Sequence, residues 1–159
     1  MENRTLCLLL DKEARRLALG KKKRGFGKDL YNGFGGKIEE GETIEQAAIR
    51  ELEEESSVEA GYENLEMVGK LYFTFPTKKE WDQLVYVFKV ASWKGEPKES
   101  EEMTAEWFDF DQIPYDRMWP DDIYWLPKVL EGKKVVGNFT FDEDNKSLLE
   151  YDVKEVASF

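Results

Sequence analysis

The stretch GKIEEGETIEQAAIRELEEESSV, from Gly36 to Val58, carries most of the information about the fold. Its second half predicts an amphipathic helix that opens at Glu42-Thr43 and runs to about Ser56. Thr43 is a favourable N-cap, and Gln46 three residues later can complete a capping box. The apolar residues at helical spacing predict the face that this helix buries, namely Ile44, Ala47, Ala48 and Leu52.

The same helix carries a run of carboxylates. Glu51 precedes Glu54 by three positions and Glu55 by four, so the three side chains share one face. Like charges at this spacing repel each other, and a divalent cation would offset the repulsion. Oxygen ligands suit Mg²⁺ or Mn²⁺. Taken alone, the run Glu53–Glu55 is more typical of a solvated helix face than of a metal site.

A glycine-rich loop runs directly into this helix and favours the metal site. Gly33, Gly35 and Gly36 allow the backbone to approach a ligand closely, and carbonyl groups there can add metal ligands. No Gly-x-x-x-x-Gly-Lys-[Ser/Thr] motif occurs, because Lys37 is followed by Ile38, and this excludes a Walker-type ATPase.

The rest of the chain alternates strand-like runs with one further helix. We expect strands at 6–10, 16–21, 65–75, 84–91, 104–110, 135–141 and 148–153, and a helix at 121–130. Pro120 just before this helix and Gly132 just after it mark its ends. This order predicts a single α/β domain over residues 1–159, with a mixed sheet between helices.

Composition excludes several kinds of chemistry. The chain has no histidine, which removes Ser-His-Asp and Cys-His catalysis and histidine-ligated zinc. The net charge of −11 disfavours binding to a nucleic-acid backbone, and it would repel a triphosphate unless cations intervene. A phosphate ligand therefore calls for a divalent metal together with local basic groups, such as the run Lys21–Arg24. By composition alone, that run could also be a nuclear localisation signal.

The N-terminal region predicts a buried strand in a protein without a membrane segment. The apolar stretch Leu6–Leu10 is too short for a signal-peptide core, and no other run is long enough to span a bilayer. Cys7 is the single cysteine, so no disulfide can form within the chain, and we expect it to be a small buried hydrophobic residue. The cytoplasm is the expected compartment, with the nucleus or the mitochondrial matrix as alternatives.

The stretch from Gly36 to Val58 resembles the Nudix box. In that pattern a Gly is followed after five residues by Glu, and after seven more by Arg-Glu-apolar-any-Glu-Glu-any-Gly-apolar. The matching positions are Gly36, Glu42, Arg50, Glu51, Leu52, Glu54, Glu55 and Val58. Ser57 stands where the family has a glycine that would end the helix in a left-handed conformation.

The resemblance implies roles for these residues. Glu51, Glu54 and Glu55 would bind the metal together with the carbonyl of Gly36, and they form the expected catalytic set. Arg50 would pair with Glu42 and hold the helix against the loop. One carboxylate, for which Glu54 is the candidate, would take a proton from the attacking water. The family often uses a distant acidic ligand as well. Glu102 is the candidate here, and its alternative is a solvated acidic loop.

Nearly the whole chain is similar to the animal MutT homologues that hydrolyse oxidised purine nucleoside triphosphates, such as 8-oxo-dGTP and 2-hydroxy-dATP. The similarity rests on Lys22–Gly27, Asn32–Lys37, Met118–Asp122, Trp107-Phe108 and Asp111–Pro114. It implies that Asp121 and Asp122 read the base, with one carboxyl protonated. Further expected substrate contacts are Asn32 at the base edge, Lys22 at the phosphates, and Phe26, Phe73 and Trp119 around the purine. An aspartate pair after a proline is also an ordinary helix start.

Several positions depart from this subfamily. Tyr31 replaces a tryptophan, the stretch Pro76–Gln83 is longer than usual, and a methionine expected near Gln83 is missing. These departures affect the choice of base and leave the hydrolysis prediction intact. Two alternatives remain open: a Nudix hydrolase of another substrate (a dinucleoside polyphosphate, a nucleotide sugar or capped RNA), and a non-catalytic nucleotide-binding module. We expect a monomer that acts on a small-molecule nucleotide and binds neither a nucleic-acid polymer nor a membrane.

Overall fold

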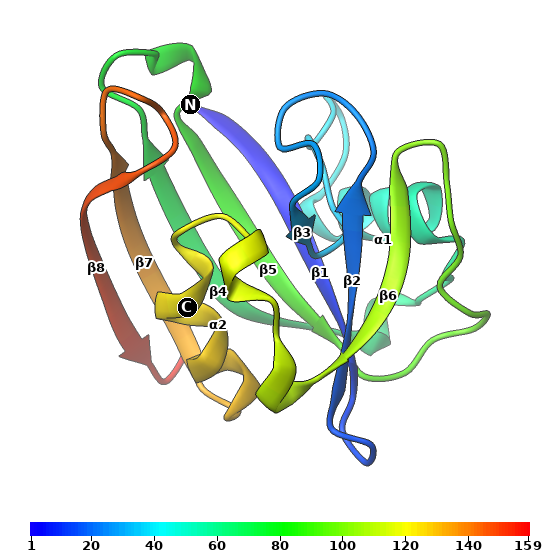
Figure 1. The fold of residues 1–159 in the computed structure, drawn as a ribbon. Helices are drawn as coiled ribbons and strands as arrows, with labels where there is room; N and C mark the ends of the chain where they lie inside the picture. Colours follow the sequence, from blue (N-terminus) through cyan, green and yellow to red (C-terminus); the bar gives the residue numbers. More distant parts are fainter.

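One mixed sheet of eight strands forms the centre of the computed structural model, which describes residues 1–159 (Figure 1). The strands are β1 (Glu2–Asp11), β2 (Arg16–Lys22), β3 (Tyr31–Asn32), β4 (Leu65–Thr74), β5 (Gln83–Val90), β6 (Met103–Asp109), β7 (Lys134–Phe141) and β8 (Leu148–Val156). They run in the order β3-β2-β1-β5-β4-β7-β8, and β6 pairs with β2. The pairs β1–β5 and β4–β7 are parallel, and the other pairs are antiparallel.

Two helices cover opposite faces of the sheet. They are α1 (Ile44–Ser56) and α2 (Asp122–Leu130). Alternate residues of β1 point to opposite faces, so Leu6, Leu8 and Leu10 join the core that contains α2, whereas Cys7 and Leu9 join the core that contains α1. Because β1 lies inside the sheet, both of its faces are buried, and its sequence is continuously apolar. The expected α/β fold with a mixed sheet between helices is confirmed.

The start and end of α1 follow from its sequence. Thr43 Oγ1 accepts a hydrogen bond from the Gln46 N–H (3.1 Å), and Gln46 Oε1 accepts one from the Thr43 N–H (2.9 Å). These two bonds form the predicted capping box. Ser57 has a φ of 66°, and its N–H donates to the Glu53 carbonyl at 2.8 Å. The helix therefore ends with a left-handed residue, as predicted, although that residue is a serine. Neither helix combines the length and the apolarity needed to cross a membrane.

Most strands lie within two residues of their predicted bounds, and β1 is the main exception. It begins at Glu2 because its polar first residues pair with β5, in the register Glu2↔Gln83. The strand β3 has two residues and is held only by short pairing with β2. Four short 3-10 turns also escaped prediction: η1 (Tyr62–Asn64), η2 (Lys79–Trp81), η3 (Phe110–Gln112) and η4 (Tyr115–Arg117). Cys7 is buried as expected, and burial raises the pKa of its thiol to about 12.

Candidate active site

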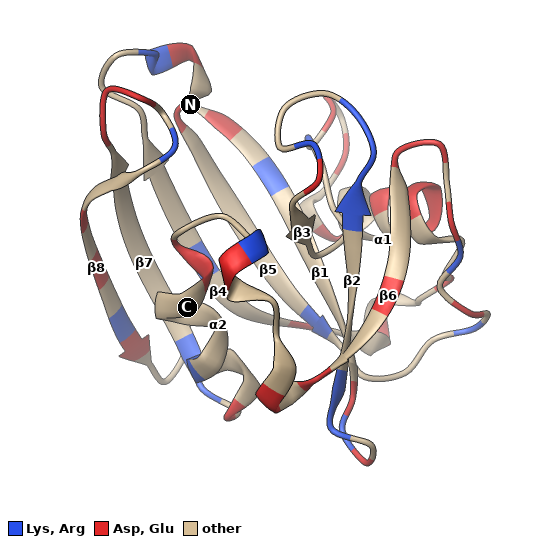
Figure 2. Cartoon of the chain, viewed as in Figure 1, with Lys and Arg blue, Asp and Glu red and all other residues tan.

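A cavity of about 670 Å³ lies between the glycine-rich loop, α1, the end of β4 and the start of α2. Its walls contain every residue that we predicted from the sequence to take part in binding or catalysis. These are Lys22, Phe26, Asn32, Gly36, Glu51, Glu54, Glu55, Phe73, Glu102, Trp119, Asp121 and Asp122. One end is acidic and is formed by α1 and the loop before β6, while the other end is mostly aromatic. Figure 2 shows the acidic residues along α1 and the basic residues at the end of β2 beside it.

The glycine-rich loop is fixed against β1. The Thr5 N–H donates to the Gly36 carbonyl (2.9 Å), and Cys7 exchanges two backbone hydrogen bonds with Phe34 (2.6 and 3.0 Å). A Cβ atom on Gly35 would lie 1.9 Å from the Thr5 carbonyl oxygen, and one on Gly36 would lie 2.6 Å from the Glu51 carboxyl group. Gly35 therefore needs glycine because backbone atoms approach it closely, whereas glycine at position 36 leaves room for the Glu51 carboxyl group. The absent side chain at Gly36 is what lets Glu51 reach the loop.

Arg50 ties α1 to this loop. Its Nε and Nη2 donate to the two carboxylate oxygens of Glu42 at 2.7 and 2.8 Å, and Nη2 also donates to the Lys37 carbonyl at 3.1 Å. The hydrogen bonds from Arg50 lower the pKa of Glu42 to about 2, and those bonds likewise raise the pKa of Arg50. This paired fork matches the expected Arg50–Glu42 contact.

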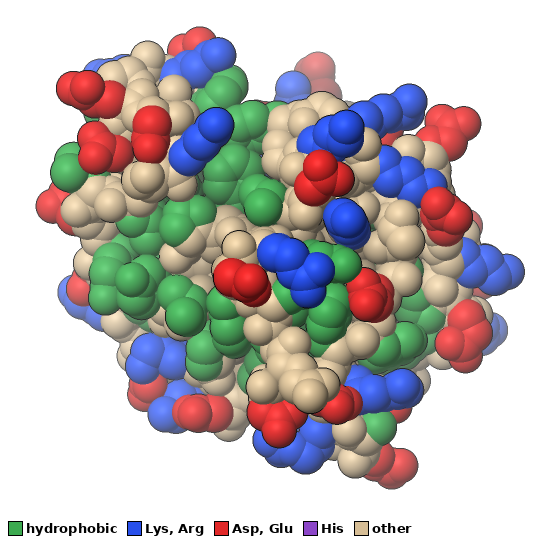
Figure 3. Space-filling model, in the orientation of Figure 1, with side chains coloured by type: hydrophobic (Ala, Val, Ile, Leu, Met, Phe, Trp, Pro, Cys, Tyr) green, Lys and Arg blue, Asp and Glu red, His purple; other side chains and the backbone are tan.

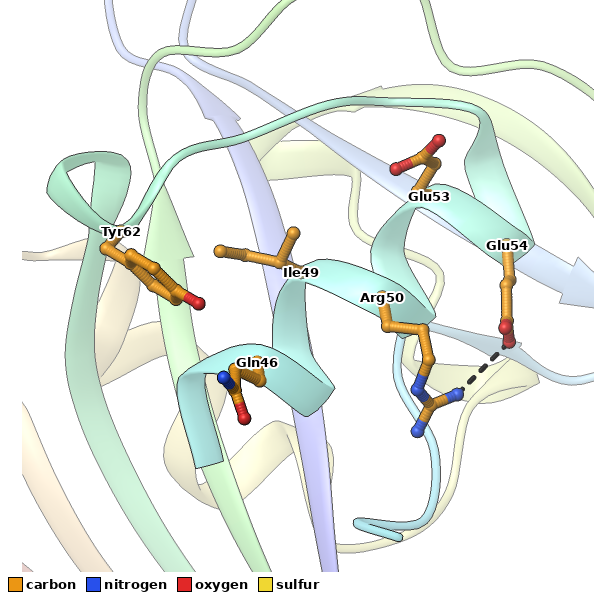
Figure 4. A pocket seen from close by; sticks show the side chains of 6 residues that line it. All are labelled: Gln46, Ile49, Arg50, Glu53, Glu54 and Tyr62. Atoms are coloured by element: carbon orange, nitrogen blue, oxygen red, sulfur yellow. Dashed lines mark hydrogen bonds and ion pairs between the residues drawn. The ribbon is translucent and has the colours of Figure 1, made fainter. Parts of the chain in front are cut away.

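Arg50 also reaches two of the candidate metal ligands. Its Nη1 donates to Glu51 Oε1 at 2.8 Å and to Glu54 Oε2 at 3.3 Å. The Glu54 contact lies on the outer side of α1, where Figure 4 shows Arg50 and Glu54 meeting while Glu53 points away from both. The residues drawn there line a second, shallower hollow, formed by Gln46, Ile49, Arg50, Glu53, Glu54 and Tyr62. This hollow lies outside the glycine-rich loop and contains no basic group other than Arg50.

Glu55 is half-buried and contacts the glycine-rich loop. Its Oε1 accepts a hydrogen bond from the Gly35 N–H at 2.7 Å. Burial raises its pKa to about 7, and the charges of Glu51 and Glu102 add to the rise, while the Gly35 N–H and Lys22 oppose it. An acidic group with such a raised pKa in a cavity is typical of a binding or catalytic site. The nearby negative charges show that a cation would be stabilised here.

Glu102 enters the same end of the cavity from the loop before β6. Its Oε1 lies 3.0 Å from Arg24 Nη2, which orients the side chain without neutralising the group of acids as a whole. No three acidic side chains converge closely enough to enclose an ion in the conformations seen here. Glu51 and Glu54 accept hydrogen bonds from Arg50, whereas Glu55 accepts one from the Gly35 N–H. The donor set itself consists of carboxylate and carbonyl oxygens, which are the ligands that Mg²⁺ and Mn²⁺ prefer.

The aromatic end of the cavity contains the predicted purine contacts. Phe26 and Trp119 lie with their ring centroids 4.9 Å apart. Phe73 stacks on Phe139 at 5.4 Å, so one side of Phe73 belongs to the core and the other to the cavity. Asn32 Oδ1 accepts a hydrogen bond from the Gly33 N–H at 3.0 Å, which fixes the orientation of its amide at the cavity wall.

Asp121 and Asp122 are both buried beneath this aromatic end, with exposures of 4% and 3%. The Asp121 side chain makes no N-capping hydrogen bond to α2, although it precedes the helix. Instead its Oδ2 accepts a hydrogen bond from the Trp125 indole N–H at 2.9 Å. Asp122 Oδ2 is buried without any hydrogen-bond partner. A buried polar atom without a partner is costly, so this arrangement favours a ligand contact over a simple helix start.

The pKa values of both aspartates are raised, for partly different reasons. Burial raises the pKa of Asp121 to about 6. Burial, and then the charge of Asp121, raise the pKa of Asp122 well above its usual value. Because two buried carboxyl groups held this close do not both ionise readily, one of them can keep a proton and donate a hydrogen bond while the other accepts one.

We did not predict several of the cavity residues from the sequence. The apolar walls come from alternate positions of the central strands and include Leu6, Leu71, Val85 and Phe141. Gln83 also lines the cavity, at the place where the subfamily pattern led us to expect a methionine. Trp125, the partner of Asp121, was missed as well. Its spacing of four residues from Asp121 on a helix was the available signal.

The chain matches the family model described as the NUDIX domain over residues 2–129, most of its length. This match, together with the fold and the spacing of the cavity carboxylates, shows that the chain belongs to the Nudix family. It is a Nudix hydrolase. Two relatives that span nearly the full chain come from animals. The Mus musculus protein, described as an oxidized purine nucleoside triphosphate hydrolase, is 46% identical over 99% of this chain and 98% of its own length.

A second relative with the same description, from Danio rerio, is 44% identical over 97% of this chain and 96% of that protein. Among solved structures, a MutT protein from Bacillus halodurans is 26% identical and has a TM-score of 0.83, covering 97% of this chain and 98% of that chain. The similarity to all three proteins therefore extends well beyond the Nudix box.

Proposed function

We propose that this chain hydrolyses oxidised purine nucleoside triphosphates, such as 8-oxo-dGTP and 2-hydroxy-dATP, to the monophosphate and pyrophosphate. The observation that carries the proposal is that the cavity joins an acidic end to an aromatic end with a buried aspartate pair, in which Asp122 Oδ2 has no hydrogen-bond partner. The descriptions of the two animal relatives support the same substrate class. Removal of such nucleotides would keep oxidised bases out of newly made DNA.

The acidic end would hold Mg²⁺, with Mn²⁺ as an alternative. Glu51, Glu54, Glu55 and Glu102 would supply carboxylate oxygens, and Gly36 would supply its carbonyl. A divalent cation in this position neutralises phosphate charge and lowers the pKa of a bound water. Water would add to one phosphorus atom of the α–β linkage, the bond from that phosphorus to the bridging oxygen would break, and the monophosphate and pyrophosphate would be released. Glu54 would accept the proton of the water, and Lys22 would contact the phosphate oxygens.

The aromatic end would select the base. A purine would lie against Phe26, Phe73 and Trp119, and its edge would meet Asn32 and the aspartate pair. A protonated Asp122 donates to a ring nitrogen or oxo group, and an ionised Asp121 accepts from an amino group. If the proton moves between the two carboxyl groups, the same pair can recognise a 2-amino-6-oxo or a 6-amino purine edge. Oxidised guanine and oxidised adenine would then both be substrates.

The proposal also covers the oligomeric state, the binding partners and the cellular compartment. The chain would act as a monomer on a small-molecule nucleotide, without a nucleic-acid polymer or a membrane as partner. The cytoplasm is the proposed compartment, with the nucleus or mitochondrial matrix as alternatives. The net charge of −11 supports a nucleotide partner that arrives with its own divalent cation rather than a nucleic-acid chain.

The direct test of the catalytic part is the Glu54→Gln variant with Glu53→Gln as its control. Both changes remove one carboxylate from the same turn of α1, but only Glu54 lines the cavity. With Mg²⁺ and 8-oxo-dGTP, pyrophosphate release should fall by roughly 100-fold in Glu54→Gln and stay near wild type in Glu53→Gln. Equal rates in the two variants, or no release by wild type with Mg²⁺ present, would overturn the proposal.

A further inference from the structure

Five aromatic side chains form a closed ring at the aromatic end of the cavity. The centroid distances around the ring are 4.5 Å for Phe26–Trp81, 5.7 Å for Trp81–Phe75, 4.7 Å for Phe75–Phe141, 6.1 Å for Phe141–Trp119 and 4.9 Å for Trp119–Phe26. Four of these rings line the cavity, and Trp81 lies behind them. Trp81 therefore closes the ring by joining Phe26 to Phe75.

Trp81 lies in η2, within the segment Pro76–Gln83 where the sequence departs from the subfamily pattern. Several contacts fix this segment. Asp82 Oδ1 accepts a hydrogen bond from the Phe75 N–H at 2.7 Å, which closes the loop between β4 and β5. Thr77 Oγ1 lies 3.2 Å from Asn145 Oδ1 in the β7–β8 turn, and Figure 1 shows the two loops side by side. Lys78 Nζ lies 4.0 Å from the centre of a Trp81 ring.

Phe26 needs this support more than the other cavity rings do. It is 51% exposed and lies on the loop between β2 and β3, whereas Phe75 and Phe141 are buried. Its aromatic neighbours are Trp81 and Trp119. Figure 3 shows hydrophobic side chains gathered at the surface between this loop and the segment that carries Trp81. If Trp81 is lost, Phe26 is held by Trp119 alone.

We propose that Trp81 is a positioning residue for recognition of the base, because it holds Phe26 against the mouth of the aromatic end. This inference rests on the proposed function, since the ligand that Phe26 contacts is a purine. Trp81 does not line the cavity, so it acts through Phe26 and not by touching the base. Its effect belongs to nucleotide binding and leaves the carboxylates at the other end of the cavity unchanged.

The test compares Trp81→Ala, Trp81→Phe and the control Tyr62→Ala. Tyr62 is an exposed aromatic residue outside the ring. Calorimetric titration with 8-oxo-dGMP in the absence of metal measures binding at the aromatic end without any need for hydrolysis. We expect Trp81→Ala to raise the Kd about tenfold, Trp81→Phe to restore most of the affinity, and Tyr62→Ala to leave it unchanged. Steady-state hydrolysis of 8-oxo-dGTP should show the same rise in KM with kcat within about twofold of wild type.

Each possible result either supports or overturns the role of Trp81. An unchanged Kd in Trp81→Ala, or a loss of kcat without a change in KM, would overturn the role of Trp81 and leave the proposed function standing. A failure of Trp81→Phe to recover affinity, in a variant that unfolds at the wild-type temperature, would also overturn it. If wild type itself does not bind 8-oxo-dGMP, the proposed substrate class fails and the role of Trp81 fails with it.

Discussion

The buried aspartate pair is costly for stability, and the proposed function gives it a role in binding. Asp121 has one hydrogen bond, from Trp125, and Asp122 Oδ2 has none. Their raised pKa values mean that the folded protein binds protons more tightly than the unfolded chain does. A core selected only for stability would not keep this pair. We infer that its benefit appears when a ligand meets the unpartnered oxygen.

The pKa of Asp121 gives a pH-dependent expectation for Asp121→Asn. The folded-state pKa is about 6 and the ordinary value is 3.8, so ionisation of Asp121 destabilises the fold as the pH rises from about 4 to about 6. Replacement by Asn removes that penalty. Urea unfolding should therefore show Asp121→Asn gaining on the order of 3 kcal/mol relative to wild type at pH 8, and on the order of 1 kcal/mol at pH 4.5. A gain that is equal at both pH values would contradict the assigned ionisation.

At the scale of single elements, α1 could be predicted almost completely from sequence. Its caps, its buried face and the Glu spacing are all local properties, and the structure reproduces the capping box and the left-handed end. The elements that escaped prediction depend on distant partners. The strand β3 exists because two of its residues pair with β2, and β1 extends to Glu2 because β5 lies beside it. Neither strand has a local pattern that would reveal such pairing.

The end of α1 carries a prediction about stability. Ser57 has a φ of 66°, which suits glycine better than serine. Ser57→Gly should therefore raise the free energy of unfolding by up to about 1 kcal/mol, while hydrolysis continues because no cavity residue changes. Ser92 is an exposed serine that does not have a positive φ, so Ser92→Gly should give no gain. Urea unfolding of the two variants measures the difference, and equal effects would argue against strain at Ser57.

At the scale of the whole molecule, the cavity joins segments that lie far apart in the chain. The Nudix box and the glycine-rich loop could be predicted, because their spacing is readable in one stretch. The apolar wall could not be predicted, because Leu71, Val85 and Phe141 face the cavity only through the order of the strands in the sheet. The ring that includes Trp81 depends in the same way on loops brought together by β4, β5 and β7. We therefore expect the choice of substrate to depend on these non-local parts.

The most direct test of the account measures kcat/KM for 8-oxo-dGTP, 2-hydroxy-dATP, dGTP and ADP-ribose with Mg²⁺, together with identification of the products. The account predicts that both oxidised purine nucleotides are hydrolysed to monophosphate and pyrophosphate at least about tenfold more efficiently than dGTP and ADP-ribose. If ADP-ribose is cleaved as efficiently as the oxidised purine nucleotides, the proposed reading of the base by Asp121 and Asp122 is wrong.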